Sequence, residues 1–143
     1  SSQKYSETMA FNLEKLPEEL LAALKTPLYA MLTTLHPDGS PHTVCVCMTY
    51  DVNHRTARII ALHNSVKVAN LRANKSTSLS MQDEEGRWAT FSGDGCIREN
   101  RASVEEAVRQ HRLRYSRKTS FSPDFVSIEI QVKRIIGEWW VNR

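Results

Sequence analysis

Apolar residues recur along this 143-residue chain at two different spacings, and each spacing predicts one type of secondary structure. Recurrence every three or four residues is typical of an amphipathic helix, and strict alternation is typical of a half-buried strand. Helical spacing predicts three helices, at residues 13–25, 66–73 and 103–117, with Ser103 capping the last. Alternation and short β-branched runs predict about six strands, at residues 29–35, 42–50, 58–62, 76–81, 88–97 and 125–140.

Short turn signals separate the predicted strands. The Asp38-Gly39 pair marks a hairpin between the first two strands, and Gly93 and Gly95 indicate a bulge or a close backbone approach in the fifth. Consecutive strands joined by short turns pair antiparallel, and no strand–helix–strand unit repeats. The pattern predicts a mainly β fold, a small closed or split barrel with peripheral helices. Residues 1–12 are predicted to be a flexible arm, and residues 13–143 a single domain.

The segment 57–75 carries the clearest local signal for a binding site. It reads as a strand, a polar turn and a short helix, with Asn64 or Ser65 as the N-cap. Lys67 falls in the first turn of that helix, where free backbone amides and the helix dipole favour an anion. The segment alone allows two interpretations. It is either a binding site for a phosphate group, here called a phosphate seat, or an ordinary connecting helix with a solvated lysine.

Composition narrows the class of protein. A hydrophobic content of 41%, a charged content of 24% and a net charge of +3 are those of an ordinary globular domain. No apolar run approaches the roughly 20 residues of a membrane span, and the charge is too small to predict a nucleic-acid partner. The three cysteines, Cys45, Cys47 and Cys96, have no metal-binding spacing. They are interpreted as reduced core thiols of a cytoplasmic protein.

Candidate catalytic chemistry is sparse, and no metal site is predicted. The chain has no G-x-S-x-G elbow, no H-E-x-x-H pair and no obvious pair of acid/base carboxylates. The protein therefore either only binds a ligand or relies on a cofactor for its chemistry. The basic cluster at residues 109–118 is interpreted as the exposed face of a helix. Trp88, Trp139 and Trp140 are candidates for the core, a ligand pocket or a subunit contact.

The order of these signals resembles a known family. The stretches LYAMLTTLHPDGSPHTVCVCMTYD, ARIIALHNSVKVANLRANKSTSLSM, RWATFSGDGCI and FVSIEIQVKRIIGEWW resemble the flavin- and deazaflavin-binding split-barrel proteins related to pyridoxamine-phosphate oxidase. The NSVKVANLRANK stretch is similar to the family's S-x-K-x-x-N-L segment. The resemblance is greatest to the actinobacterial branch that uses the deazaflavin coenzyme F420, which includes biliverdin-reductase-like members. It implies an FMN-binding-type split β-barrel.

The resemblance also implies a cofactor site, carried over position by position. Residues next to the ring system and ribityl chain would be His42, Thr43, Val44, Ile60, Ala61 and Leu62. Residues at the cofactor phosphate would be Ser65, Val66 and Lys67. Trp88 matches a family aromatic that approaches the ring across a dimer interface. The implied assembly is a homodimer with the cofactor near the subunit interface, and no catalytic side chain is predicted.

The implied function is an F420-dependent oxidoreductase that passes a hydride to a planar conjugated acceptor, such as a biliverdin-like tetrapyrrole, a quinone or an enone. The alternatives are a non-catalytic flavin, deazaflavin or haem carrier, and an FMN-dependent enzyme similar to pyridoxamine-phosphate oxidase. One departure counts against that oxidase itself, because its arginine–lysine pair has no equivalent at residues 43–47. Ser65 stands where the family has a further phosphate-binding arginine, which implies weaker or different phosphate binding.

Overall fold

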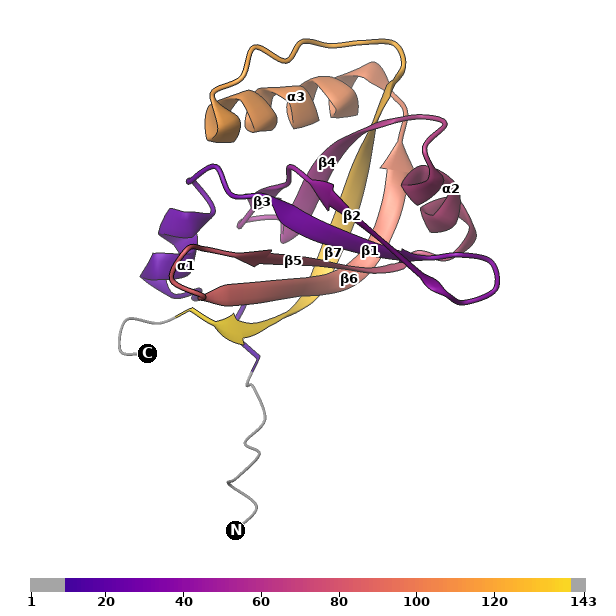
Figure 1. Cartoon of the computed structure of the whole chain (residues 1–143). Helices are drawn as coiled ribbons and strands as arrows, with labels where there is room; N and C mark the ends of the chain where they lie inside the picture. Colours follow the sequence, from indigo (N-terminus) through magenta and orange to yellow (C-terminus); the bar gives the residue numbers. More distant parts are fainter. Residues whose placement is uncertain (1–9, 140–143) are drawn as a thin grey trace.

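The computed structural model describes residues 10–139 and contains one antiparallel sheet with three helices around it (Figure 1). The strand order is β2-β1-β5-β6-β7-β4-β3, seven strands within the described residues. The helices are α1 (Glu18–Ala23), α2 (Val66–Ala73) and α3 (Arg101–Tyr115). The strands are β1 (Ala30–Leu35), β2 (Pro41–Val46), β3 (Thr49–Asp51), β4 (Thr56–Leu62), β5 (Ser76–Gln82), β6 (Trp88–Arg98) and β7 (Phe125–Glu138).

The sheet wraps around a single apolar core. Successive strand residues point to opposite faces, so every second side chain of each strand faces inward. The inward side chains of β1, β5, β6 and β7 include five with no exposed surface, Leu32, Leu79, Phe91, Ile128 and Ile130. Figure 1 shows α1 and α2 at opposite ends of the sheet, and α3 outside it, where it contacts β3, β4 and β7. The predicted mainly β split barrel with peripheral helices is confirmed.

One predicted strand, 42–50, is in fact two strands that belong to opposite edges of the sheet. β2 pairs only with β1, and β3 pairs only with β4. Two residues lie between these strands, Cys47 and Met48, and they carry the chain from one edge of the sheet to the other. Because only two residues join the two edge strands, the edges must lie close together, and the sheet curves into a barrel. Alternation alone could not predict it, since a strand that changes partner keeps its period of two.

Arg114, at the end of α3, binds the backbone at this crossing. Its guanidinium donates to the carbonyl oxygen of Met48 at 2.7 Å, to that of Thr26 at 2.8 Å and to that of Ala23 at 3.1 Å. The side chain is buried, and burial lowers the pKa of this guanidinium from its usual value. Arg114 was predicted to belong to a solvated basic face, and that prediction is wrong for this residue. Three carbonyl acceptors compensate for its burial.

Tyr115 completes the same connection. Its hydroxyl accepts the N–H of Met48 at 3.0 Å and lies 2.8 Å from the carbonyl oxygen of Leu28, to which it can donate. Both backbone polar groups of Met48 are therefore satisfied by α3 rather than by a neighbouring strand. We call Arg114, Tyr115 and Met48 the crossing clamp. It fixes the position at which the chain stops pairing with β1 and begins to pair with β4.

The helix limits differ from the prediction at two helices and agree at one. α2 spans the predicted residues 66–73. α1 begins at Glu18 rather than at residue 13, because Pro17 takes the N-cap position with a φ of −55°. α3 begins at Arg101 with Asn100 at the N-cap, three residues before the predicted cap Ser103. It ends where Ser116 adopts the left-handed conformation, with a φ of 51°.

Several residues lie in surroundings that composition did not predict. Cys45 and Cys96 are exposed on the outer face of the sheet, so their prediction as core thiols is wrong, and only Cys47 is half-buried. Trp139 is fully buried, and Trp140 lies outside the described residues. Most of the predicted arm also lies outside them. Its end is held against β7, where the N–H of Phe11 donates to the carbonyl oxygen of Ile135 at 2.8 Å.

The predicted bulge in β6 is confirmed, since the pairing of β6 with β7 shifts register between Ser92 and Gly93. A Cβ on Gly93 would fall on the carbonyl oxygen of Gln131, so only glycine fits this close approach. No helix among the described residues is both long and apolar enough to cross a membrane.

Removing the Tyr115 hydroxyl should destabilise the fold. Tyr115→Phe leaves the buried N–H of Met48 without its acceptor, which costs about 1–3 kcal/mol of unfolding free energy. Urea denaturation followed by fluorescence measures this as a lower midpoint with an unchanged slope. Tyr29→Phe is the matched control, because the hydroxyl of Tyr29 is exposed and bound only by Arg117. Equal midpoints for the two variants would contradict the role assigned to the crossing clamp.

Candidate functional site

The barrel has two strand edges that stay open on either side of the crossing. β2 has β1 on one side and no strand on the other. β4 pairs with β3 only over its first three residues, so Ile59 to Leu62 pair only with β7. β2 continues through Cys47 and Met48 into β3, and β3 is the strand that pairs with the first part of β4. Unpaired backbone N–H and C=O groups along such edges are ready to bind a ligand.

The predicted ring-contacting residues all lie on these two edges. On β2, Thr43 is exposed on the outer face, while His42 and Val44 are half-buried on the inner one. On β4, the side chain of Ala61 is buried in the core, so only its backbone can reach a ligand. Ile60 points outward, toward the side where α3 contacts β4, and Leu62 is exposed at the strand end. Backbone groups rather than side chains therefore dominate this part of the site.

The turn after β4 leaves the first amides of α2 without a side-chain cap. We call this helix start, with Lys67, the proposed anion seat. Ser65 occupies the predicted N-cap position, but its hydroxyl donates to the carbonyl oxygen of Leu62 at 2.9 Å instead of accepting a helix amide. The first intrahelical bond joins the N–H of Ala69 to the carbonyl oxygen of Ser65. The amides of Val66 and Lys67 thus point out of the helix end without a side-chain cap. Such amides, together with the helix dipole, favour an anion.

Lys67 adds a positive charge to this seat. Its side chain is half-buried, and burial lowers the pKa of its amine below the ordinary value. The first turn of α2 contains no acidic residue, and the ion pairs among residues 10–139 do not include Lys67. A half-buried ammonium with no carboxylate beside it is stabilised when an anion binds. Uncapped amides and a half-buried amine without a carboxylate partner are the features that the predicted phosphate seat requires.

α2 also lies next to β1. The amide of Asn70 donates to the hydroxyl of Thr34 at 3.0 Å, and both side chains are buried. Thr34 pairs directly with His42 across the strands, so the two side chains share the face that α2 covers. His36 lies two residues beyond Thr34, and its ring contacts that of His42 with centroids 5.1 Å apart. The start of α2, β2 and the end of β4 thus enclose one end of the barrel.

Sequence reasoning missed His36 and Asn70 as members of this site. It treated the histidines as scattered, because residues 36 and 42 are six apart and flank a turn. The available signal was the hairpin itself. A turn centred on Asp38 and Gly39 pairs the residues on either side, and so brings the two rings to one face.

Trp88 is the one predicted residue that lies elsewhere. It begins β6, and its indole N–H donates to Glu138 at 3.0 Å. Leu71 of α2 contacts the same strand near Gly95, seven residues further on. At about 3.3 Å per residue, that separation exceeds 20 Å. Within one copy of the chain, Trp88 therefore lies at the far end of β6 from the residues that contact α2.

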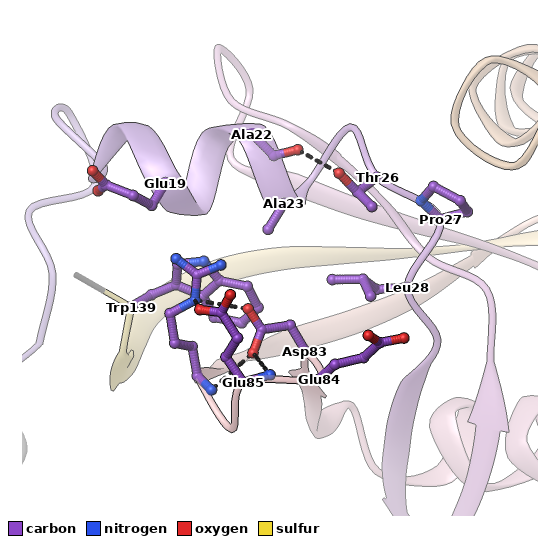
Figure 2. A pocket seen from close by; sticks show the side chains of 11 residues that line it. Glu19, Ala22, Ala23, Thr26, Pro27, Leu28, Asp83, Glu84, Glu85 and Trp139 are labelled. Carbon is purple, nitrogen blue, oxygen red and sulfur yellow. Dashed lines mark hydrogen bonds and ion pairs between the residues drawn. The ribbon is translucent and has the colours of Figure 1, made fainter. Parts of the chain in front are cut away.

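A separate cleft of about 580 Å³ lies between α1 and the β5–β6 turn (Figure 2). Acidic side chains surround it, and the guanidinium of Arg87 binds Asp83 at 2.7 Å and lies over the ring of Trp139. The cleft contains none of the predicted cofactor residues, and it is at the α1 end of the sheet, away from α2. It is therefore not the predicted cofactor site.

The sequence is similar to a known family and to a known enzyme. The sequence model of the family described as Pyridoxamine 5'-phosphate oxidase matches residues 16–138. An F420H(2)-dependent biliverdin reductase from Mycobacterium tuberculosis (strain CDC 1551 / Oshkosh) is 34% identical over 123 residues, which are 86% of this chain and 88% of that protein.

Solved structures show the same fold. A structure described as an F420 reductase superposes with a TM-score of 0.69 at 22% identity, over 84% of this chain and 98% of its own. General Stress Protein 26 from Bacillus anthracis superposes with a TM-score of 0.68 at 14% identity, over 85% of this chain and 92% of its own. At these identities the likeness is one of fold.

The amine of Lys67 should titrate below the ordinary range of lysines and respond to an anion. After ¹³C-methylation of the amines, NMR titration follows each lysine, and Lys67→Arg identifies the Lys67 signal. Burial lowers the pKa of this amine, so its midpoint lies at lower pH. Added inorganic phosphate should move that midpoint upward, because a nearby anion favours the charged form. An ordinary midpoint that phosphate leaves unchanged would contradict the anion seat.

Proposed function

The chain belongs to the pyridoxamine 5'-phosphate oxidase family, and from that membership we propose that it is an F420-dependent oxidoreductase. We propose further that its acceptor is a planar conjugated molecule, such as a biliverdin-like tetrapyrrole, a quinone or an enone. The observation that carries the proposal is the 34% identity to an F420H(2)-dependent biliverdin reductase along nearly the full length of both chains.

The residues at the α2 end of the barrel fit a cofactor of this kind. Lys67 and the open amides of Val66 and Lys67 would hold its phosphate, with Ser65 fixing the turn through Leu62. The backbone of residues 42–44 and 60–62 would hold the ring system and ribityl chain along the open edges. When bound, reduced F420 supplies a hydride. The task left to the chain is to hold the cofactor and acceptor together and to exclude water from between them.

The FMN-dependent alternative also has support. The family description names an oxidase, and the same anion seat suits the phosphate of FMN. The identity to an F420-dependent relative favours the deazaflavin. The carrier alternative shares the cofactor site and differs only in having no acceptor, so turnover distinguishes it from the enzyme.

We propose a homodimer in which Trp88 of one copy approaches the cofactor of the other. The outer face of β1, β5 and β6 supports this, because it is lined by small hydroxyl side chains around the exposed Met31. Cross-strand hydroxyl contacts of 3.0 Å order this face, one between Thr33 and Thr43 and one between Thr90 and Ser80. Trp88 extends from the same face. Sedimentation equilibrium of the purified protein should give twice the 16.3 kDa chain mass, and a monomer at micromolar concentration would contradict the dimer.

We also propose a cytoplasmic location. The three cysteines are free thiols, and two of them are exposed. Exposed thiols persist in the reducing cytoplasm and tend to be oxidised outside it.

The function is tested by titrating the purified protein with F420 and with FMN, following fluorescence. We expect F420 to bind, and reduced F420 to be oxidised when biliverdin or a quinone is added. Lys67→Ala should weaken F420 binding by about 1.5–3 kcal/mol, the range for a hydrogen bond to a charged group. Lys75→Ala is the matched control, since Lys75 follows the other end of α2 and is largely exposed.

Each outcome separates one alternative. Tight FMN binding without F420 binding would replace the proposed coenzyme. F420 binding without turnover for biliverdin, quinones or nitro-aromatics would favour the carrier. An unchanged dissociation constant for Lys67→Ala would place the phosphate away from α2.

A further inference from the structure

The cleft between α1 and the β5–β6 turn has no role in the proposed function. Its volume of about 580 Å³ lies within the roughly 300–1,000 Å³ that is usual for small-molecule sites. Helix α1 and residues 26–28 line one side, and residues 83–87 line the other (Figure 2). Apolar surface from Ala22, Pro27 and Leu28 lies beside charged side chains. The cleft therefore has the size and the mixed chemistry of a ligand site.

Carboxylates outnumber cations in this cleft. Among the residues that the structure describes, one cation lines it, Arg87, and four carboxylates, those of Glu19, Asp83, Glu84 and Glu85. Figure 2 shows Glu19 on α1, across the cleft from Glu84 and Glu85 on the turn. Asp83 is paired with Arg87, whereas neither Glu19 nor Glu84 forms a hydrogen bond or salt bridge in the described part of the chain. A cleft lined by an excess of one charge concentrates ligands of the opposite charge.

Arg87 offers hydrogen-bond donors to the same cleft. Its Nε donates to Asp83 at 2.7 Å, while its two terminal nitrogens form no hydrogen bond with the residues that the structure describes. The hydrogen bond to Asp83 is the largest cause that raises the pKa of this guanidinium, and the charge of Glu19 adds to it. Glu19 is on α1, so the side of the helix that carries it faces Arg87. Open terminal N–H groups of a guanidinium suit a carboxylate.

The indole of Trp139 is a second, independent observation that points to a ligand. The side chain lines the cleft, has no exposed surface, and lies under Arg87, whose Cζ is 5.6 Å from the ring centroid. Its N–H has no hydrogen-bond acceptor among the described residues. The indole N–H of Trp88, in contrast, donates to Glu138. Buried donors are almost always paired, so the N–H of Trp139 calls for an acceptor that the described chain does not supply.

We propose that this cleft binds a free basic α-amino acid. The ligand carboxylate accepts hydrogen bonds from the terminal N–H groups of Arg87 and from the indole N–H of Trp139. The cation of the ligand side chain lies against the carboxylates of Glu19 and Glu84. Its methylene groups cover the apolar surface of Leu28 and its neighbours. The inference does not depend on the cofactor, because none of these residues belongs to the proposed F420 site.

Both charges of the ligand are needed for this fit. A simple amine would leave the donors of Arg87 and Trp139 without an acceptor. A simple carboxylic acid would meet the unpaired carboxylates of Glu19 and Glu84. A basic amino acid has an acceptor for the first pair and a cation for the second, and its net positive charge agrees with the excess of carboxylates in the cleft.

The test is a titration of the ¹⁵N-labelled full chain with L-arginine, in which NMR follows the indole N–H signals. Trp88→Phe and Trp140→Phe identify two of these signals, and the remaining one is that of Trp139. The matched ligands are agmatine, which lacks the carboxylate, and L-citrulline, whose side chain is uncharged. The signal of Trp88 is the internal reference, because its N–H already has an acceptor.

We expect L-arginine to shift the Trp139 signal until it saturates and to leave the Trp88 signal in place. Agmatine and L-citrulline should each bind at least about tenfold more weakly, because each lacks one charged hydrogen-bonding group. Glu19→Gln should weaken L-arginine binding about threefold, the scale of a partly exposed ion pair. Glu18→Gln is the matched control, since Glu18 is exposed on the same helix and does not line the cleft. It should leave the affinity unchanged.

Three results would overturn the inference. The first is a Trp139 signal that does not move at millimolar L-arginine. The second is equal affinity for L-arginine, agmatine and L-citrulline, and the third is an equal effect of Glu19→Gln and Glu18→Gln. The titration contains no F420 or FMN, so its outcome is separate from that of the proposed function.

Discussion

The fold depends on how the backbone of Met48 is hydrogen-bonded. At this residue the chain leaves one edge of the sheet and joins the other, and so has no neighbouring strand to bind its N–H and C=O. The hydroxyl of Tyr115 accepts the N–H of Met48, and the guanidinium of Arg114 donates to its carbonyl oxygen. Arg114 also donates to the carbonyl oxygen of Ala23, the last residue of α1. Because an unpaired buried backbone group costs as much as a lost hydrogen bond, this clamp makes the crossing possible. The same crossing leaves β2 and the end of β4 as open edges, so the feature that closes the barrel also creates the two edges proposed to hold the cofactor.

The proposed site divides into two parts. At the start of α2, Lys67 and the free amides would select an anion, and the turn fixed by Ser65 leaves those amides without a side-chain cap. Along β2 and β4, backbone groups would offer directional but uncharged contacts, because the adjacent side chains are mostly small or apolar. An aromatic ring system linked to a phosphate matches both parts. The proposed role of Trp88 is placed in a second copy, because Trp88 lies at the far end of β6 from α2.

Local signals in the sequence were sufficient for most of the helices and strands, and insufficient for contacts between distant residues. The segment 66–73 was predicted as a helix with Ser65 at its cap position, because spacing and cap chemistry are local properties. The strand at 42–50 was not predicted to break, since the break depends on Arg114 and Tyr115. For the same reason Arg114 was assigned to a solvated face, and His36 was left out of the site until pairing with His42 brought it there. The cofactor roles of the named residues remain predictions that binding measurements decide.

The crossing clamp also bears on the order in which the protein folds. Its hydrogen bonds join residues that are 66 to 91 positions apart in the chain. Hairpins such as β1–β2 and β5–β6 close loops of only a few residues, so they form at a much smaller entropic cost. Contacts of long sequence separation form slowly and late. We therefore expect the barrel to close in the last stage of folding, after α3 has docked, and the two open edges take their final positions only from that moment. Acquisition of the cofactor would then mark the completion of the fold.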